Sequence, residues 1–195
     1  MPKQKLQIVI IDDSKADIEV FQRYLRKDAD FEYEIKFTSK GSDGIALIQQ
    51  HRPDCVLLDY RLPDMTGFEV LEKIRQELQI HSVPIVMLTG SVDESLVVQA
   101  LKRGAQDYLS KSTLSFENLL RAVHNAIEKI QVLRRLEEAL QARDEFLSVA
   151  SHELKTPLTS MTLQMQYGLL LLKRSEGGAI PRAEIHKILT RADTQ

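Results

Sequence analysis

The stretch Cys55-Val56-Leu57-Leu58-Asp59 decides the fold of this chain. It has no polar residue to face solvent before its final acid, which indicates a strand covered on both faces, as in a parallel sheet. A second apolar run, Gln7–Ile11, is also followed by acids, Asp12 and Asp13. Because the carboxyl ends of parallel strands meet at one edge of a sheet, we expect these three carboxylates to converge.

Apolar runs alternate with amphipathic stretches outward from this strand, which predicts successive β-α units. We therefore expect an α/β fold with a five-stranded, doubly wound parallel sheet. We take its order as 2-1-3-4-5, in which the strands that end at Ile11 and Asp59 are neighbours. The expected strands are Gln7–Ile11, Tyr33–Phe37, Cys55–Asp59, Pro84–Thr89 and Gln106–Ser110. Inward stripes are expected on the first helix at Ile18, Phe21 and Leu25, and on the third at Phe68, Leu71, Ile74 and Leu78.

Composition disfavours several classes of function. The 195 residues carry a net charge of −2, so the basic excess typical of nucleic-acid binding is missing. No apolar run approaches the ~20 residues that a membrane span needs. The single cysteine, Cys55, cannot form an internal disulfide and is interpreted as a small buried hydrophobe. We expect a cytoplasmic protein without a membrane span in this chain and without a nucleic-acid partner.

Three converging carboxylates would repel one another at neutral pH. Relief comes from protonation or from a hard divalent cation, of which Mg²⁺ is the natural candidate. Thr89 ends the fourth strand and Lys111 follows the fifth, so both are expected beside Asp59, where they would bind an added phosphoryl group. The alternative is that Asp12 or Asp13 only caps the following helix, and that Thr89 and Lys111 are ordinary polar residues at strand ends.

Residues 6 to 130 resemble the receiver domain of two-component response regulators. The resemblance rests on Asp12-Asp13, Asp59, Thr89 with Tyr108, and Lys111, all at that family's spacings, and on the loop from Asp59 to Gly67. It implies a flavodoxin-like fold in which Asp59 accepts a phosphoryl group from a phosphohistidine. It also implies that Thr89 and Tyr108 form a switch pair.

The same resemblance implies a ligand set for Mg²⁺. The ion would bind Asp13, Asp59 and the backbone carbonyl of Arg61, with Asp12 acting mostly through water. The sequence departs from the family at Ser112, where proline is usual, so the turn that aims Lys111 is expected to be looser. Arg61 occupies a variable position that tunes the lifetime of the phosphoryl group.

A long helix is expected beyond Ser115. An apolar column recurs every seven residues, at Leu119, Ala126, Leu133, Leu140, Leu147, Leu154 and Met161, which predicts a coiled-coil homodimer. A second column is interrupted between Ile130 and Leu136. Pro157 is expected to bend the helix and the segment 175–178 to end it. Pro181 is expected in the first turn of a second helix.

His152 falls on the outward face of this helix, where a phosphoryl carrier must be reachable. The alternative is an ordinary surface histidine, as we interpret His51, His81, His124 and His186. A zinc-binding H-E-x-x-H motif is rejected because Thr156 stands at the position of the second ligand.

Residues 144 to 174 resemble the first helix of the histidine kinase dimerisation and phosphotransfer domain, with the phosphorylation box Ser151–Leu158. The resemblance implies that His152 is the phosphorylated histidine, Glu153 its acid/base partner, and Thr156 a contributor to dephosphorylation of a receiver. It implies a truncated helical hairpin and the N-terminal part of a hybrid histidine kinase. This sequence contains no segment that resembles an ATP-binding domain, so whether the chain itself is a kinase is left open.

The expected organisation is a receiver core at 1–115, a fifth receiver helix extending into a coiled-coil linker at 116–143, and a partial dimerisation and phosphotransfer domain at 144–195. The leading hypothesis is a phosphorelay protein whose receiver controls the dimeric helix carrying His152. A histidine kinase catalytic domain or a phosphotransfer protein would be its partner. The alternative is a receiver-driven dimerisation module in which His152 is inactive.

Overall fold

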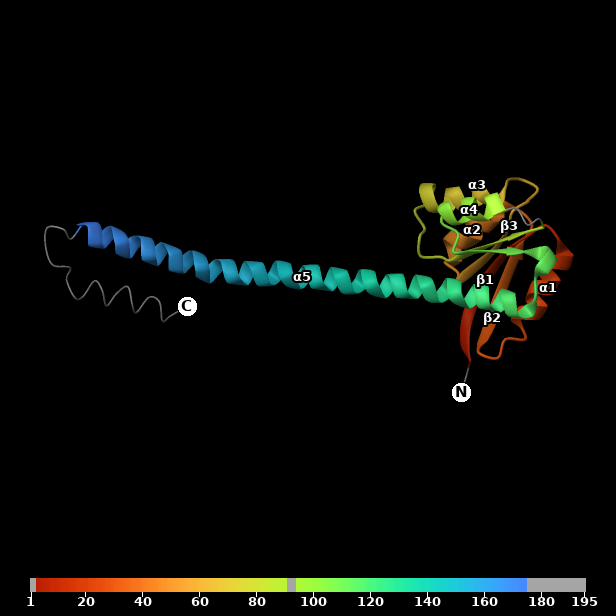
Figure 1. The fold of residues 1–195 in the computed structure, drawn as a ribbon, viewed down its shortest axis with the longest axis horizontal. Coiled ribbons are helices and arrows are strands. Elements are labelled where there is room, and N and C mark those ends of the chain that lie inside the picture. The colour runs from red at the N-terminus through yellow and green to blue at the C-terminus, as the bar shows by residue number, and fades with distance from the viewer. Residues whose placement is uncertain (1–2, 91–93, 175–195) are drawn as a thin grey trace. The chain divides into compact units, whose positions relative to one another are not determined.

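The computed structural model describes residues 3–90 and 94–174. One sheet of five parallel strands has the order β2-β1-β3-β4-β5, which confirms the predicted flavodoxin-like topology (Figure 1). The strands are β1 (Gln4–Ile11), β2 (Phe31–Thr38), β3 (Cys55–Asp59), β4 (Ile85–Thr89) and β5 (Asp107–Ser110). The central strands β3 and β4 are buried at every position, as their uninterrupted apolar sequences predict.

The first two strands begin earlier than the apolar pattern predicts. Gln4 pairs with Phe31, so β1 and β2 extend three and two residues before Gln7 and Tyr33. The reason is that a strand ladder is made by backbone groups, which pair whether or not the side chains are apolar. Only β2 alternates between exposed and half-buried positions over its first part, as expected of an edge strand.

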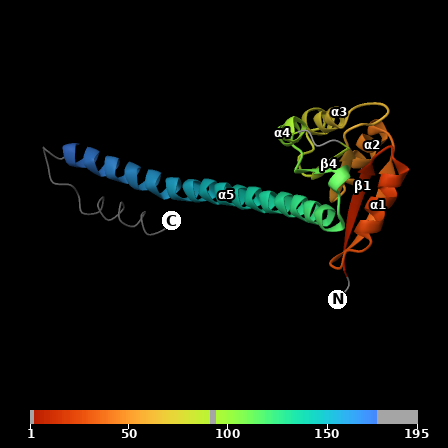
Figure 2. The same ribbon diagram turned by 45° about the vertical axis from the view of Figure 1, so that its right-hand side comes forward.

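Helices cover both faces of the sheet. They are α1 (Lys15–Leu25), α2 (Gly41–His51), α3 (Gly67–Glu72) continued by the π-helix η1 (Lys73–Glu77), α4 (Glu94–Lys102), the 3₁₀ turn η2 (Lys111–Thr113) and α5 (Phe116–Arg174). Figures 1 and 2 show α2, α3 and α4 gathered on one side of the sheet. Gly104, with φ of +96°, follows α4 and adopts a left-handed backbone conformation that glycine accepts without strain.

Two apolar cores lie on the two faces of the sheet. One contains the predicted stripe of α1 together with the start of α5, where Leu119 and Val123 are fully buried. The other contains the predicted stripe of the third helix, of which Leu78 is only partly buried. Alternate residues of β1 and β3 enter opposite cores, so the sheet is fixed between two helical layers.

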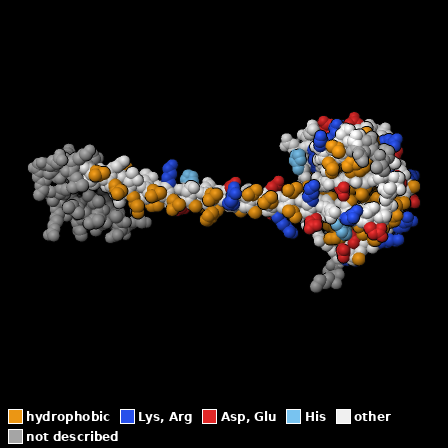
Figure 3. All heavy atoms as spheres, in the orientation of Figure 1, with side chains coloured by type: hydrophobic (Ala, Val, Ile, Leu, Met, Phe, Trp, Pro, Cys, Tyr) orange, Lys and Arg blue, Asp and Glu red, His pale blue; other side chains and the backbone are white. Residues whose placement is uncertain are grey.

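The chain divides into two units, Met1–Leu136 and Glu137–Gln195, and α5 contributes to both. The seven-residue column changes its environment along α5. Leu119 and Ala126 are buried in the receiver core, whereas the later members are exposed: Leu133, Leu140, Leu147, Leu154 and Met161. Figure 3 shows apolar side chains recurring along the part of α5 in the second unit.

Pro157 lies inside α5. The expected helix end at 175–178 and the second helix at Pro181 lie outside the described residues, and so does the truncated hairpin. Within the part of the chain that the structure describes, no helix combines the length and apolarity needed to cross a membrane.

Candidate functional site

The expected carboxylates lie together at the carboxyl edge of the sheet. β1 and β3 are neighbours, with Ile11 paired to Leu58, so Asp12 and Asp13 emerge beside Asp59. Asp12 and Asp59 are buried and Asp13 is exposed. One oxygen from each of the three side chains lies within 4.8 Å of the others. The convergence that the strand pattern predicts is therefore present in the structure.

Lys111 reaches this cluster from the turn after β5. Its Nζ lies 2.6 Å from Asp12 Oδ2, 2.6 Å from Asp59 Oδ1 and 2.9 Å from Asp17 Oδ2. Burial works to lower the pKa of Lys111, but its contacts with the three carboxylates outweigh burial and raise the pKa above its ordinary value. The ammonium is therefore charged at neutral pH and offsets part of the negative charge of the cluster.

Asp12 is the most buried member of the cluster. Its burial raises the pKa of its carboxyl group, although Lys111 and the backbone N–H of Ser14, 2.9 Å from Asp12 Oδ1, oppose the shift. Asp12 Oδ2 has no hydrogen bond, because the nearby Lys111 Nζ forms an ion pair without hydrogen-bond geometry. A buried carboxylate oxygen in a set made only of oxygen donors fits a hard cation such as Mg²⁺.

The remaining receiver residues occupy neighbouring positions. The backbone N–H of Arg61 donates to Asp59 Oδ2 at 2.8 Å, which orients the carboxylate, while the metal-binding role of the Arg61 carbonyl stays a prediction. Thr89 is buried at the end of β4, the strand next to β3. Tyr108 is half-buried on β5, opposite Met87. The switch roles of Thr89 and Tyr108 also stay predictions.

The turn that carries Lys111 has regular secondary structure. Residues Lys111–Thr113 form the 3₁₀ turn η2, and the hydroxyls of Ser110 and Ser112 are hydrogen-bonded at 2.8 Å. Ser112 therefore supplies a side-chain contact where the family usually has proline.

Sequence reasoning missed two carboxylates at this edge. Asp17 contacts Lys111 from the first turn of α1. Asp64 accepts hydrogen bonds from Gly41 N at 2.8 Å and Ser42 N at 3.0 Å, which lower the pKa of Asp64 to about 2. Asp64 thereby joins the loop after β3 to the start of α2. The sequence signal for Asp17 was its position one turn beyond Asp13.

The interpretation of His124 as an ordinary surface histidine is wrong. His124 Nε2 lies 2.7 Å from Asp28 Oδ2 and 2.9 Å from the hydroxyl of Tyr33. Burial opposes ionisation of Asp28, but hydrogen bonds from Tyr33, Asp30 N and His124 hold its pKa below the ordinary value. This cluster links the end of α1, β2 and α5 on the side of the first core.

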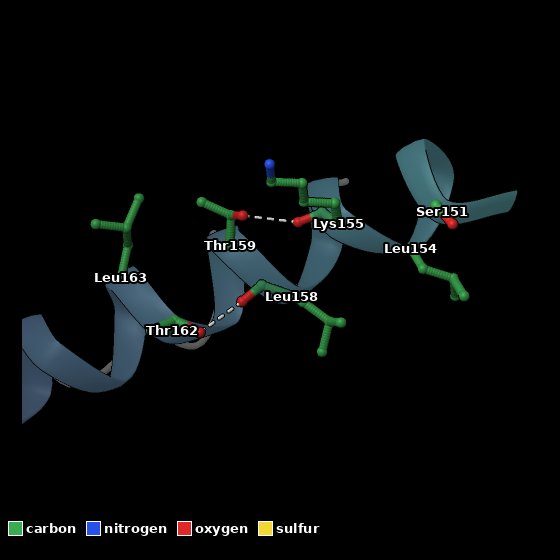
Figure 4. Close-up of a pocket in the computed structure, with 7 residues that line it drawn as sticks. All are labelled: Ser151, Leu154, Lys155, Leu158, Thr159, Thr162 and Leu163. Carbon is green, nitrogen blue, oxygen red and sulfur yellow. Dashed lines mark hydrogen bonds between the residues drawn. The ribbon is translucent and has the colours of Figure 1, made fainter. Parts of the chain in front are cut away.

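The second unit displays the other expected site. His152, Glu153 and Thr156 are all exposed on α5, and the hydroxyl of Thr156 donates to the backbone carbonyl of His152 at 3.2 Å. Leu154 and Leu158 extend to one side of the helix and Lys155 to another (Figure 4). Among the residues that the structure describes, those that line the shallow hollow in that view all belong to α5.

The fold and the first site together define a class of protein. A doubly wound sheet presents buried aspartates at the switch point of its strand order, and a lysine from the turn after the last strand bridges them. The profile of the response regulator receiver domain matches residues 8–124. The chain therefore belongs to the response regulator receiver domain family.

Curated relatives agree with this assignment. Regulatory protein LuxO of Vibrio cholerae is 35% identical over 127 residues, which cover 64% of this chain and 26% of LuxO. Protein PilH of Pseudomonas aeruginosa is 29% identical over 118 residues, which cover 60% of this chain and 94% of PilH. The match thus spans about a quarter of the length of LuxO and nearly all of PilH.

Solved structures give the same result for the fold. The signal receiver domain of a LuxO repressor protein from Vibrio parahaemolyticus superposes with a TM-score of 0.60 at 26% identity, over 68% of this chain and 98% of that one. The CheY-like receiver domain from Methanospirillum hungatei superposes with a TM-score of 0.57 at 25% identity, over 67% and 98%. These similarities concern the receiver.

Proposed function

We propose that this protein is a two-component phosphorelay protein whose receiver accepts a phosphoryl group on Asp59 and controls a dimeric helix that carries His152. The first half of this proposal, phosphorylation of Asp59, rests on the ion-paired arrangement at the sheet edge. Lys111 Nζ lies 2.6 Å from both Asp59 and Asp12, so a fixed positive charge stands beside the expected acceptor. Positioning and charge neutralisation are the main requirements of phosphoryl transfer.

In the proposed reaction, an oxygen of Asp59 attacks the phosphorus of a phosphohistidine on a partner protein. The new O–P bond forms as the N–P bond breaks, and the electron pair of that bond returns to the imidazole nitrogen. The Arg61 N–H holds Asp59 Oδ2, which limits rotation of the carboxylate. Mg²⁺ held by Asp13, Asp59 and the backbone carbonyl of Arg61, with Asp12 mostly through water, would neutralise charge on the phosphoryl oxygens.

Phosphorylation of the full chain by a small-molecule phosphodonor tests the first half. We expect one acid-stable, base-labile phosphoryl group in the presence of Mg²⁺, and none in Asp59→Asn. Asp54→Asn is the matched control, because Asp54 precedes the same strand and is exposed at its opposite end. Equal labelling of Asp59→Asn and wild type would refute the assignment of Asp59.

The second half rests on the exposure of His152 and on the resemblance of its surroundings to a phosphorylation box. The exposed imidazole is reachable for in-line attack, and the neighbouring Glu153 is exposed as well. We propose that the receiver core at 1–115 passes its state through the linker at 116–143 to the partial dimerisation and phosphotransfer domain at 144–195. α5 begins inside the receiver core and continues to Arg174.

Incubation with a separate histidine kinase catalytic domain and ATP tests the role of His152. We expect an acid-labile, base-stable label that is lost in His152→Gln and kept in His81→Gln. A phosphodonor should also change disulfide crosslinking of cysteines placed beside His152, and the change should disappear in Asp59→Asn. Crosslinking that responds equally in Asp59→Asn would contradict control by the receiver.

A second candidate function is a dimerisation module in which His152 is inactive. It is supported by the exposed apolar column on α5. Apolar residues at seven-residue spacing are explained by packing against a partner helix, without any phosphoryl transfer at His152. Dimerisation that depends on Asp59 phosphorylation, together with an unlabelled His152, would favour this candidate.

A further inference from the structure

We propose that Asp17 is a positioning residue that holds Lys111 in the unphosphorylated state and releases it to the phosphoryl group on Asp59. The inference deepens the proposed function and rests on Asp59 as the acceptor. Its starting point is the hydrogen bond of 2.9 Å from Lys111 Nζ to Asp17 Oδ2, which joins the turn after β5 to the first turn of α1.

The contact between Lys111 and Asp17 matters because the lysine has a limited number of hydrogen-bond donors. An ammonium group has three N–H donors and no more. In the structure three carboxylates surround Lys111 Nζ, those of Asp12, Asp17 and Asp59. A phosphoryl group on Asp59 brings new oxygen acceptors beside the same nitrogen. Because three carboxylate oxygens already lie within 2.9 Å of Lys111 Nζ, the nitrogen can turn donors towards the phosphoryl oxygens only if at least one of the present contacts weakens.

Burial decides which contact weakens. The side chain of Asp12 is 0% exposed, so loss of its cation would leave a buried charge without compensation. At Asp59 the charged phosphoryl oxygens replace the carboxylate, so the ammonium keeps an anionic partner at that residue. The side chain of Asp17 is 36% exposed, so water can replace the ammonium there at small cost. The contact with Asp17 is therefore the one that the phosphoryl group displaces.

The backbone keeps Asp17 in place for this exchange. Ser14 caps α1 by accepting a hydrogen bond from the backbone N–H of Asp17, which fixes the residue in the first helical turn. Asp17 thus competes with the phosphoryl group for Lys111 without contacting Asp59 itself. Removing its charge should favour the phosphorylated state, whereas damage to the fold would disfavour it.

Binding of beryllofluoride, a stand-in for the phosphoryl group, tests the inference on the full chain with Mg²⁺. We expect Asp17→Asn to bind beryllofluoride about two- to fivefold more tightly than wild type, the range of a partly exposed ion pair. The half-life of the aspartyl phosphate should lengthen in parallel. A crystal structure of the wild-type adduct should show Lys111 Nζ moved out of ion-pair distance from Asp17.

Glu19→Gln is the matched control, because it removes one exposed carboxylate of the same helix that has no contact with Lys111. Unchanged or weaker binding in Asp17→Asn would overturn the inference, and so would an equal gain in Glu19→Gln, which would indicate a general charge effect. A wild type that binds beryllofluoride no better than Asp59→Asn would overturn the proposed acceptor instead, and the inference with it.

Discussion

At the scale of single residues, the receiver site depends on how buried each charge is. Asp12 and Asp59 are enclosed and rely on Lys111, whereas Asp13 and Asp17 are accessible to solvent. A buried carboxylate without a cation is costly, so the residues that we propose to bind a cation or a phosphoryl group also affect the stability of the resting protein.

Lys111→Met is expected to lower the free energy of unfolding by about 3 kcal/mol in the absence of Mg²⁺, because it leaves Asp12 and Asp59 without their cation. Millimolar Mg²⁺ should restore more stability to this variant than it adds to wild type, since the ion takes over the compensation. Chemical denaturation with and without Mg²⁺ measures both quantities. Lys102→Met, at an exposed position at the end of α4, is the control and should change neither.

Asp64→Asn is expected to destabilise the receiver by about 0.5–1 kcal/mol at neutral pH, because its carboxylate caps α2 through Gly41 and Ser42. The pKa of Asp64 is lowered from 3.8 to about 2 on folding, so its contribution is complete above 3.8 and is lost as the pH falls towards 2. Denaturation of both proteins across this range should show the difference closing. A difference independent of pH would contradict the charge argument.

At the scale of elements, a buried arginine ties the end of the third helix to the segments that follow it through hydrogen bonds. The π-helix η1 widens the helix, with Leu78 N bonded to Lys73 O, and Arg75 within it is 6% exposed. Its guanidinium donates to the backbone carbonyls of Ile80, Val83 at 2.8 Å and Gly104 at 3.2 Å. Burial lowers the pKa of Arg75 to about 10, so it is still charged at neutral pH.

Arg75→Met is expected to lower the free energy of unfolding by about 3 kcal/mol, because several buried carbonyl oxygens lose their donor at once. Thermal or urea denaturation checks this value. Arg103→Met is the control: Arg103 is exposed and makes an ion pair with Glu72 at 3.3 Å, a contact worth less than about 1 kcal/mol. Similar losses in the two variants would argue against the role of burial.

At the scale of the whole molecule, α5 serves two purposes. Its first part completes the receiver core, and its exposed apolar column in the second unit has the seven-residue spacing of a helix that pairs with another helix. The described residues alone leave this column uncovered, which supports the proposed homodimer.

Leu147→Lys is expected to shift the protein from dimer to monomer, since it places a charge at a 52% exposed member of the column. Analytical ultracentrifugation over a range of concentrations measures the shift. Val149→Lys is the control, because Val149 is 57% exposed but lies off the column. Equal sedimentation of wild type and Leu147→Lys would contradict pairing through this face.

Sequence by itself predicted the parallel strands and the convergence of Asp12, Asp13, Asp59 and Lys111, and the resemblance to receiver domains agreed with the strand order. Apolar runs specify buried parallel strands, and the topology then carries every strand end to one edge. Tertiary structure alone decided the partners that lie far apart in sequence: Asp17 with Lys111, Asp28 with His124, and Arg75 with Gly104. The physical reason is that periodicity encodes which face of an element is buried, whereas the meeting of two distant side chains depends on how whole elements pack.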